Sequence, residues 1–308
     1  MKIAFYFLPA LFLVGCGNQE PVVSSGKIDR IADFPSENVA PRNVDVWLPE
    51  GYDSSTKYAV IYMHDGQMLF DSTTTWNKQE WKVDEVVTKL IDDGRISPCI
   101  VVGIWNNGDY RHTEYFPRAA LDGLAEEEAT EITRKYLKNE ALSDKYLKFI
   151  VDELKPYIDS HYSTGVDRGK TYTMGASMGG LISLYAICEY PDVFGGAGCL
   201  STHWPLIDAD SANNSTEIPI VKSLRNYLAE HLPSPADHKI YFDYGTATLD
   251  ALYEPHQLLV DEIMASKGFN SENWMTKKYD GDDHSELSWS KRLAIPLTFL
   301  LATDQYRQ

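Results

Sequence analysis

Basic residues are scarce in this sequence. Its 308 residues include 28 Lys and Arg against 45 Asp and Glu, which gives a formal net charge of −17. A nucleic-acid-binding protein needs a basic surface to neutralise phosphates, so this imbalance argues against nucleic acid as a partner. The sequence also lacks the polybasic segment that holds many proteins on anionic lipid.

Cysteine is scarce too. The sequence has only four cysteines, Cys16, Cys99, Cys188 and Cys199, and no CxxC or Cys/His spacing typical of zinc ligands. We therefore predict no structural zinc site. A chain of this length buries roughly three quarters of its unfolded surface, so its core needs neither disulfides nor a metal.

Long hydrophobic runs are missing except at the N-terminus. Residues 3–14 form an apolar run after Lys2 that is too short to span a bilayer and has the layout of a secretory signal peptide. The run ends in Leu13-Val14-Gly15-Cys16, which resembles a bacterial lipobox. We predict a lipoprotein signal peptide over residues 1–15 and acylation of Cys16, with palmitate as an example. The alternative is an ordinary signal peptide cleaved nearby.

The residues after this signal predict where the protein is held. Gly17, rather than Asp, follows Cys16 and resembles the pattern that sorts lipoproteins to the outer membrane. Residues 16–40 are rich in Ser, Pro, Asn and Gly with little periodicity, which indicates a tether. The sequence thus predicts a bacterial cell-envelope protein, anchored in the outer membrane through its N-terminal lipid alone.

The rest of the chain has the composition of a globular domain, with 44% hydrophobic and 24% charged residues overall. From residue 41 onward, expected strands and helices alternate, which predicts an α/β fold with a mostly parallel central sheet and helices on both faces. We see no internal repeat or interior linker, so residues 41–308 are expected to form one domain. Strands are predicted at 43–48, 58–63, 99–105, 170–174, 196–200, 239–244 and 274–279, and helices at 81–91, 126–138, 143–160, 178–189, 254–267 and 287–303, the last interrupted by Pro296.

One short motif suggests a nucleophile. Gly175-Ala176-Ser177-Met178-Gly179 matches G-x-S-x-G and lies between a predicted strand and a predicted helix, the setting of a nucleophile elbow. The turn is sharp, so residues without a Cβ are expected on either side of Ser177. The helix start directs its free N–H groups, that of Met178 first, toward a developing oxyanion. The alternative is a tight turn with a surface serine.

Serine becomes a good nucleophile only when a base takes its proton. His284 follows the last predicted strand, which places it at the same sheet edge as the elbow. The other histidines after Ser177 are His203, His231, His238 and His256. The loop after the strand at 239–244 carries two possible acids, Asp250 and Glu254, and both qualify at this point.

Several segments resemble the Putative esterase family of α/β-hydrolases, which includes esterase D-type, feruloyl-esterase-type and enterochelin-esterase-like proteins. The resemblance extends over residues 41–302. It is carried by His64-Asp65-Gly66-Gln67, Trp81-Lys82-Val83-Asp84-Glu85, Glu114-Tyr115-Phe116-Pro117-Arg118, the elbow with Tyr190-Pro191-Asp192-Val193-Phe194, the loop from Gly245 to Asp250, and His284-Ser285-Glu286 with Trp289 and Arg292.

This resemblance implies roles for particular residues. It makes Ser177 the nucleophile, Asp250 the acid and His284 the base. The second oxyanion donor would be the backbone N–H of Gln67, beside that of Met178. Relatives often place the acid two or three residues after the loop glycine, whereas Asp250 is five after Gly245, so Glu254 stays open as the acid.

The resulting hypothesis is a serine carboxylic-ester hydrolase that needs no cofactor and acts on acyl esters of a glycan, a phenolic acid or a siderophore. Two alternatives are an acyltransferase on the same scaffold and a non-catalytic binding lipoprotein. Aromatic residues are frequent in the predicted edge loops, namely Trp76, Trp81, Trp105, Tyr110, Tyr115, Trp204 and Trp289. We expect substrate contacts from Trp81, Trp105, Arg111, Trp204 and Trp289, although core packing or a structural ion pair is an equally ordinary role for each.

Overall fold

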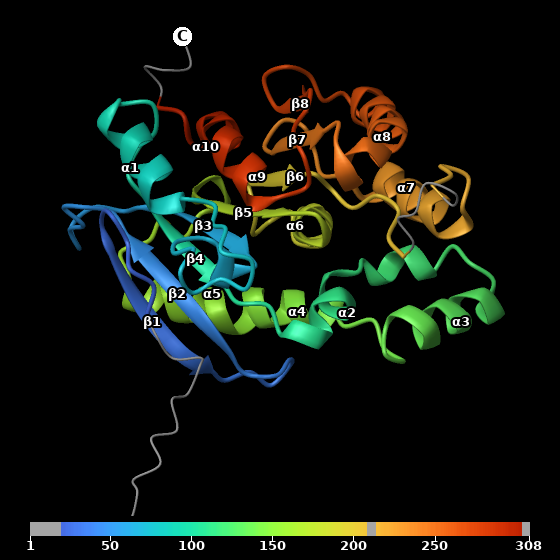
Figure 1. The fold of residues 1–308 in the computed structure, drawn as a ribbon, viewed down its shortest axis with the longest axis horizontal. Coiled ribbons are helices and arrows are strands. Elements are labelled where there is room, and N and C mark those ends of the chain that lie inside the picture. Colours follow the sequence, from blue (N-terminus) through green and yellow to red (C-terminus); the bar gives the residue numbers. More distant parts are fainter. Residues whose placement is uncertain (1–19, 208–213, 304–308) are drawn as a thin grey trace, which may run out of the picture.

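A computed structural model describes residues 20–207 and 214–303, so the predicted signal peptide and Cys16 lie outside the described residues. The described chain forms an eight-stranded sheet in the order β1-β2-β4-β3-β5-β6-β7-β8 (Figure 1). The strands are β1 (Lys27–Phe34), β2 (Arg42–Leu48), β3 (Ala59–His64), β4 (Cys99–Ile104), β5 (Thr171–Ala176), β6 (Gly196–Leu200), β7 (Lys239–Gly245) and β8 (Trp274–Tyr279).

The sheet is mostly parallel, as the sequence predicts. The pairs along β4-β3-β5-β6-β7-β8 are all parallel, whereas β1–β2 and β2–β4 pair antiparallel. Every residue of β3, β4 and β5 is buried. Strands covered on both faces have no polar side to alternate with, which explains the continuous apolar runs in the sequence.

Helices cover both faces of the sheet. They are α1 (Val83–Asp92), α2 (Arg111–Tyr115), α3 (Glu126–Tyr136), α4 (Ser143–Lys148), α5 (Lys155–His161), α6 (Met178–Glu189), α7 (Pro219–His231), α8 (Glu254–Ser266), α9 (Glu286–Arg292) and α10 (Ala294–Leu301). Helices α1, α9 and α10 pack on one face and enclose one hydrophobic core, while α2 to α8 enclose the larger core on the other (Figure 1). This layered arrangement confirms the predicted fold class.

The predicted tether over residues 16–40 is wrong in extent. Residues 27–34 form β1, which pairs with β2 along the edge of the sheet. The segment before it is also docked, because the backbone N–H of Val22 donates to Asp71 and that of Ser24 donates to Asp84. An edge strand needs only one neighbour, so weak hydrophobic alternation sufficed here and gave little signal in the sequence.

Two predicted helices are divided. The range 143–160 contains a wider π-helical segment, η4 (Phe149–Leu154), before α5, where Pro156 has no N–H to donate. The last helix breaks at Leu293 rather than at Pro296, which lies inside α10. The proline ring clashes with the carbonyl four residues earlier, so the break precedes the proline. Helix α7 was not among the predicted elements.

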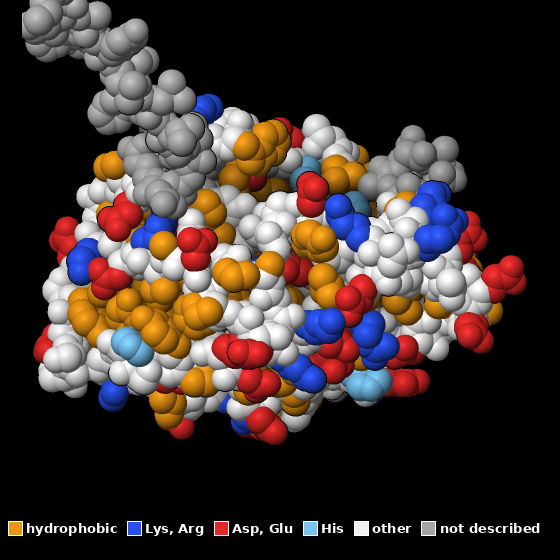
Figure 2. Space-filling model, turned by 90° about the horizontal axis from the view of Figure 1, so that it is seen from below, with side chains coloured by type: hydrophobic (Ala, Val, Ile, Leu, Met, Phe, Trp, Pro, Cys, Tyr) orange, Lys and Arg blue, Asp and Glu red, His pale blue; other side chains and the backbone are white. Residues whose placement is uncertain are grey.

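The described part of the chain has three cysteines, Cys99, Cys188 and Cys199, and all are buried and unpaired. No helix in the described ranges combines the length and the apolar character of a membrane span. On the face shown in Figure 2, acidic and basic side chains lie interspersed rather than in regions of one sign. Surface ion pairs such as Arg118–Asp122 and Lys145–Glu140 fit this distribution.

Candidate active site

Ser177 lies on the sharp turn between β5 and α6. Its backbone has φ 60° and ψ −124°, a strained conformation for a residue with a side chain. A Cβ on Gly175 would come within 2.8 Å of the Gly179 backbone, so the turn requires glycine there. At Gly179 a Cβ would meet its nearest neighbour at 3.5 Å, an ordinary contact, so steric need accounts for only one of the two motif glycines.

Three other non-glycine residues in the loops after the parallel strands also have positive φ, namely Asp65, Ser201 and Thr248. Asp65, with φ 58° and ψ 45°, is in the left-handed region and not in the conformation of Ser177. Thr248 shows what one of these conformations achieves, because its Oγ1 accepts a hydrogen bond from the backbone N–H of His284 at 2.9 Å. Such strain is kept only where the surrounding structure enforces it, and it collects at functional sites.

The structure brings Asp250 and His284 together. Asp250 Oδ1 lies 2.6 Å from His284 Nδ1, and the Asp250 side chain is fully buried. Asp250 comes from the short helix η6 (Thr248–Leu252) after β7, and His284 from the loop after β8. Glu254 instead pairs with Lys278 at 2.8 Å on the surface. Of the two acids that the sequence leaves open, Asp250 is the one that meets the histidine.

The second oxygen of Asp250 is equally well held. Oδ2 accepts hydrogen bonds from Ser201 Oγ at 2.5 Å and from the backbone N–H of Gly245 at 2.6 Å. Burial by itself would raise the pKa of Asp250, but the hydrogen bonds with His284, Ser201 and Gly245 outweigh it and bring this pKa below its usual value. The carboxylate is therefore ionised at neutral pH.

Ser201 is the centre of a buried network behind the acid. Its Oγ accepts from Trp289 Nε1 at 2.9 Å and from Arg292 at 2.7 Å, so its own hydrogen is left for Asp250. Arg292 also pairs with buried Asp243 at 3.0 Å. Burial raises the pKa of Asp243 to about 6 against the lowering effect of Arg292. The sequence predicts no role for Ser201 or Arg292, because their partners lie tens of residues away along the chain.

Two backbone N–H groups stand beside the nucleophile turn. Met178 is the first residue of α6, and Gln67 lies in the short helix η1 (Gly66–Met68) that follows β3. N–H groups in the first turn of a helix have no intrahelical acceptor. Gly66 lets this loop approach β4, since a Cβ there would come within 2.5 Å of the Gly103 backbone.

One pocket of about 750 Å³ lies against the nucleophile turn. Ser177, His284 and Gln67 line it together with three of the five predicted substrate contacts, Trp81, Arg111 and Trp289. The remaining lining residues are Asp65, Met68, Trp76, Asn77, Gln79, Asn106, Gly108, Ser285 and Glu286.

Known proteins share both the sequence pattern and the fold of this chain. The model of the Putative esterase family matches residues 39–294, most of the sequence. This chain belongs to the Putative esterase family. Its fold is similar to that of a solved ferulic acid esterase, with a TM-score of 0.63 at 18% identity over 89% of this chain and 98% of that one. It is also similar to the enterobactin esterase of Shigella flexneri, with a TM-score of 0.62 at 18% identity over 91% and 60%.

The relatives found by sequence align with only part of this esterase-family chain. It is 27% identical over 184 residues to the endo-1,4-beta-xylanase/feruloyl esterase of Xylanibacter ruminicola, a match that covers 58% of this chain and 22% of that protein. It spans between 22% and 60% of the length of that relative and two proteins of Bacillus subtilis, YbbA and YjcH.

Two predicted substrate contacts in this esterase-family chain are wrong. Trp204 is buried, and its Nε1 donates to Gln257 at 3.1 Å. Trp105 donates to Asp45 at 2.8 Å, beneath the guanidinium of Arg30. Neither lines the pocket of Ser177. Both residues follow strands at the same end of the sheet as Ser177. However, the Trp105 indole packs against an ion pair and the Trp204 indole packs in the core, and position after a strand does not reveal the direction of a side chain.

The other predicted contacts line the pocket but have structural partners. Arg111 forms two hydrogen bonds of 2.7 Å with Asp65, which lower the pKa of Asp65 against the raising effect of burial. Trp289 lies edge-on to His284 with ring centroids 5.0 Å apart, and Trp81 packs on Trp289 at 5.4 Å. The two indoles therefore form the floor that positions the histidine ring.

Tyr253 is a residue at the nucleophile that the sequence did not single out. Its phenol is buried, lies 2.9 Å from His203 Nδ1 and interacts with Ser177. The backbone N–H of His203 donates to the Ser177 carbonyl at 3.2 Å, which closes a ring of three residues. Burial and nearby His284 lower the pKa of His203 to about 3, so His203 adds no positive charge. The spacing from Asp250 could have identified Tyr253. Residues three apart in a 3₁₀ turn lie on the same side of it, and Asp250 and Tyr253 are three apart.

We expect Tyr253→Phe to lower kcat for ester hydrolysis by about five- to tenfold with KM nearly unchanged, the loss of one hydrogen-bond partner at the nucleophile. The rate of Ser177 inactivation by phenylmethylsulfonyl fluoride should fall in parallel. Measuring both rates checks this, since a merely structural role for the phenol would leave the inactivation rate of the folded variant unchanged.

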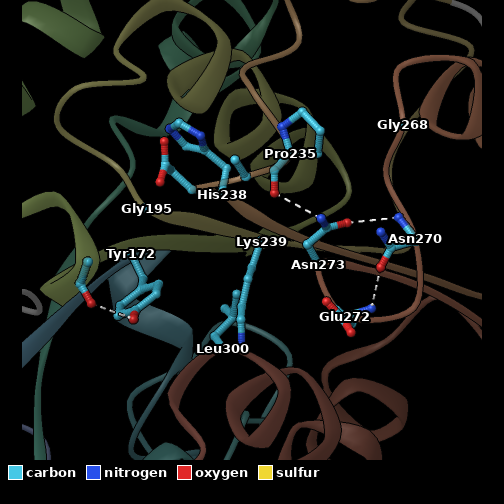
Figure 3. Close-up of a pocket in the computed structure, with 13 residues that line it drawn as sticks. Tyr172, Gly195, Pro235, His238, Lys239, Gly268, Asn270, Glu272, Asn273 and Leu300 are labelled. Carbon is cyan, nitrogen blue, oxygen red and sulfur yellow. Dashed lines mark hydrogen bonds between the residues drawn. The ribbon is translucent and has the colours of Figure 1, made fainter.

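A second cavity, of about 580 Å³, lies at the amino-terminal ends of the parallel strands, opposite the end that carries Ser177 (Figure 3). It is lined by residues that begin strands, such as Tyr172 and Lys239, far along the strands from Ser177. Its polar groups already bond locally, as when Asn273 donates to the Pro235 carbonyl at 2.8 Å and accepts from the Asn270 N–H. Its lining contains no serine or cysteine, and none of the hydrogen bonds described for it joins a carboxylate to a histidine.

Proposed function

We propose that this chain is a serine carboxylic-ester hydrolase whose catalytic residues are Ser177, Asp250 and His284. The observation that carries the proposal is the 2.6 Å contact between buried Asp250 and His284, because His284 lines the same pocket as a serine on a strained elbow. A surface serine in an ordinary turn would need neither a buried carboxylate–imidazole pair nor two first-turn N–H groups beside it.

The mechanism follows from these contacts. Because Asp250 holds His284 Nδ1, the other ring nitrogen is left to take the Ser177 proton as the serine attacks the ester carbonyl. The N–H groups of Met178 and Gln67 stabilise the oxyanion of the tetrahedral intermediate. His284 then gives the proton to the departing alcohol, and water hydrolyses the acyl-enzyme by the reverse sequence of proton transfers.

Asp250 keeps this cycle electrostatically favourable. Its carboxylate stabilises the imidazolium that forms on His284 and fixes the ring tautomer. Ser201, Gly245 and Arg292 satisfy the carboxylate on its far side, so it does not have to be rehydrated or reoriented during the reaction. No step of this sequence requires a metal or an organic cofactor.

The substrate class is proposed from relatives and from the pocket together. Proteins similar to this chain are described as feruloyl and enterobactin esterases, which makes esters of a phenolic acid, a glycan or a siderophore the candidates. A pocket lined with amides, carboxylates and tryptophans fits a polar or aromatic ester better than a fatty acyl chain.

The proposal is tested by hydrolysis of p-nitrophenyl acetate, first alone and then with an added alcohol acceptor. Hydrolysis that the acceptor leaves unchanged supports the hydrolase. Transfer of most acetyl groups to the acceptor would show that the protein is an acyltransferase instead. If methyl ferulate, acetylated xylan and a catecholate siderophore were also not turned over, the protein would be a non-catalytic binding lipoprotein.

The location proposed for this esterase is the bacterial cell envelope, with the domain anchored in the outer membrane through a lipid on Cys16. It is supported by the apolar run over residues 3–14 and by Leu13-Val14-Gly15-Cys16 at its end. Because Val22 and Ser24 dock on the domain, the proposed tether does not extend past them.

Cys16→Ser should abolish lipidation and release the protein from membranes while the esterase activity of the purified domain stays within twofold of wild type. Mass spectrometry of the N-terminal peptide from bacterial membranes checks this. An unmodified N-terminus beginning at another residue in the wild-type protein would contradict the lipoprotein assignment.

A further inference from the structure

We propose that Trp76 and the polar wall beside it form a sugar-binding subsite, so that the ester substrate is a glycan ester whose sugar ring stacks on Trp76. This inference rests on the proposed esterase function and selects one substrate class from those above. It concerns the part of the substrate that stays at the pocket mouth after the ester group has reached Ser177.

Trp76 is exceptional among the described residues. Its side chain is 84% exposed, the highest value among the large hydrophobic side chains described, and it lines the pocket that contains Ser177. Burying a side chain of this size would contribute on the order of 2–3 kcal/mol. Leaving it in water at the mouth of a catalytic pocket therefore provides a flat apolar face for a ligand rather than for the core.

The loop that carries Trp76 is held rigidly around it. On one side Thr75 is buried, and its Oγ1 donates to the Ser72 carbonyl at 3.0 Å. On the other side Asn77 Nδ2 donates to Glu286 Oε2 at 2.8 Å, which ties the loop to the start of α9. Because both neighbours are fixed while the indole faces solvent, the platform is preorganised, which reduces the entropy lost on binding.

The wall beside the platform suits hydroxyl groups. Asn77, Gln79 and Glu286 line the same pocket, and within the described residues the buried Oε1 of Gln79 has no hydrogen-bond partner. Amides offer donors and acceptors side by side, and carboxylates offer paired acceptors, which match the vicinal hydroxyls of a sugar ring. Met68 is the only aliphatic side chain in the lining, too little for a long acyl chain.

Charge separates a sugar from an iron-loaded siderophore. The pocket lining contains two carboxylates, Asp65 and Glu286, and one guanidinium, Arg111, which is already paired with Asp65. The whole sequence carries a net charge of −17. A multiply anionic catecholate complex would meet no unpaired arginine or lysine among the lining residues, whereas a neutral glycan loses nothing by approaching an acidic surface.

The test compares two esters with the same acyl group. Methyl ferulate and a feruloylated arabinoxylan trisaccharide differ only in the alcohol, and methyl acetate with acetylated xylotriose form the matching acetyl pair. We expect wild type to prefer the sugar ester within at least one pair. Trp76→Ala should lower kcat/KM for that sugar ester by roughly tenfold, mainly through KM, and change the methyl ester by less than twofold. Trp76→Phe should restore most of the loss, and Leu258→Ala, which trims an exposed apolar side chain on α8, should change neither.

Other results would overturn the inference. Equal losses on both esters of a pair would make Trp76 a support for the catalytic loop, and no loss on either would remove it from binding. A loss of vesicle binding in Trp76→Ala with unchanged sugar-ester kinetics would assign the tryptophan to lipid. Titration of tryptophan fluorescence with xylotriose in Ser177→Ala does not depend on turnover: saturable quenching that Trp76→Ala removes would support the subsite even if the hydrolase proposal failed, and its absence would reject it.

Discussion

Ser177→Ala should lower kcat for p-nitrophenyl acetate by about 10⁴- to 10⁶-fold while leaving the protein folded. The serine hydroxyl supplies the atom that attacks the carbonyl, and the variant keeps only what substrate binding and the two oxyanion N–H groups provide. The turn itself should survive, because alanine can take the same place on the elbow beside Gly175 with one atom fewer.

Three measurements make this prediction sharp. Initial rates at saturating substrate give kcat, thermal unfolding shows that the fold is intact, and mass spectrometry detects the phosphonyl adduct that a fluorophosphonate forms on Ser177 in wild type alone. Ser160→Ala, at an exposed serine near the end of α5, is the matched control and should retain full activity. More than about a tenth of wild-type activity in Ser177→Ala would exclude this serine as the nucleophile.

The second large effect concerns the acid. Asp250→Asn should lower kcat by up to about 10⁴-fold, because an amide can favour the wrong tautomer of His284 and cannot stabilise the imidazolium. The structural reason is specific, since Asp250 Oδ1 lies 2.6 Å from His284 Nδ1 while Oδ2 is held by Ser201 and Gly245. KM should change little, because Asp250 is buried and does not line the pocket.

Glu254→Gln is the matched control for the acid, since it makes the same chemical change four residues later. Glu254 pairs with Lys278 on the surface, so this variant should lose less than threefold in kcat and less than about 1 kcal/mol of stability. Measured side by side at saturating substrate, the reverse ranking would move the acid to Glu254. Two mild effects would point to the aspartates beside His284, namely Asp282 or Asp283.

Much of the site was predictable because it follows from strand ends. In a parallel sheet every carboxyl end lies at one edge, so residues just after β5, β7 and β8 must lie near one another. That rule, with the elbow motif, was enough to predict that Ser177, His284 and one of two acids, Asp250 or Glu254, would be neighbours. The family resemblance favoured Asp250 but left Glu254 open, and the hydrogen bonds of the folded chain agree with Asp250.

The errors have a different origin. Trp105 and Trp204 also follow strands at this edge, but a short distance along a loop leaves the direction of a side chain open. Asp45 and Gln257 come from elsewhere in the chain and turn the two indoles away from the pocket. Likewise, β1 was predicted as tether because a strand with one neighbour shows little hydrophobic alternation, and its pairing with β2 depends on the finished sheet.

The sequence by itself determined the class of fold, the positions of most strands along the chain and the chemistry available where the parallel strands end. Hydrophobic periodicity and motif position are local properties, so a single sequence reveals them. Only the tertiary structure decided which groups support that chemistry. Ser201 and Arg292 reach Asp250 from 49 and 42 residues away, and Tyr253 reaches Ser177 from 76, and no local pattern records such distances. Contacts of this kind depend on how whole helices and strands pack together. The spacing of residues along the chain does not reveal that packing.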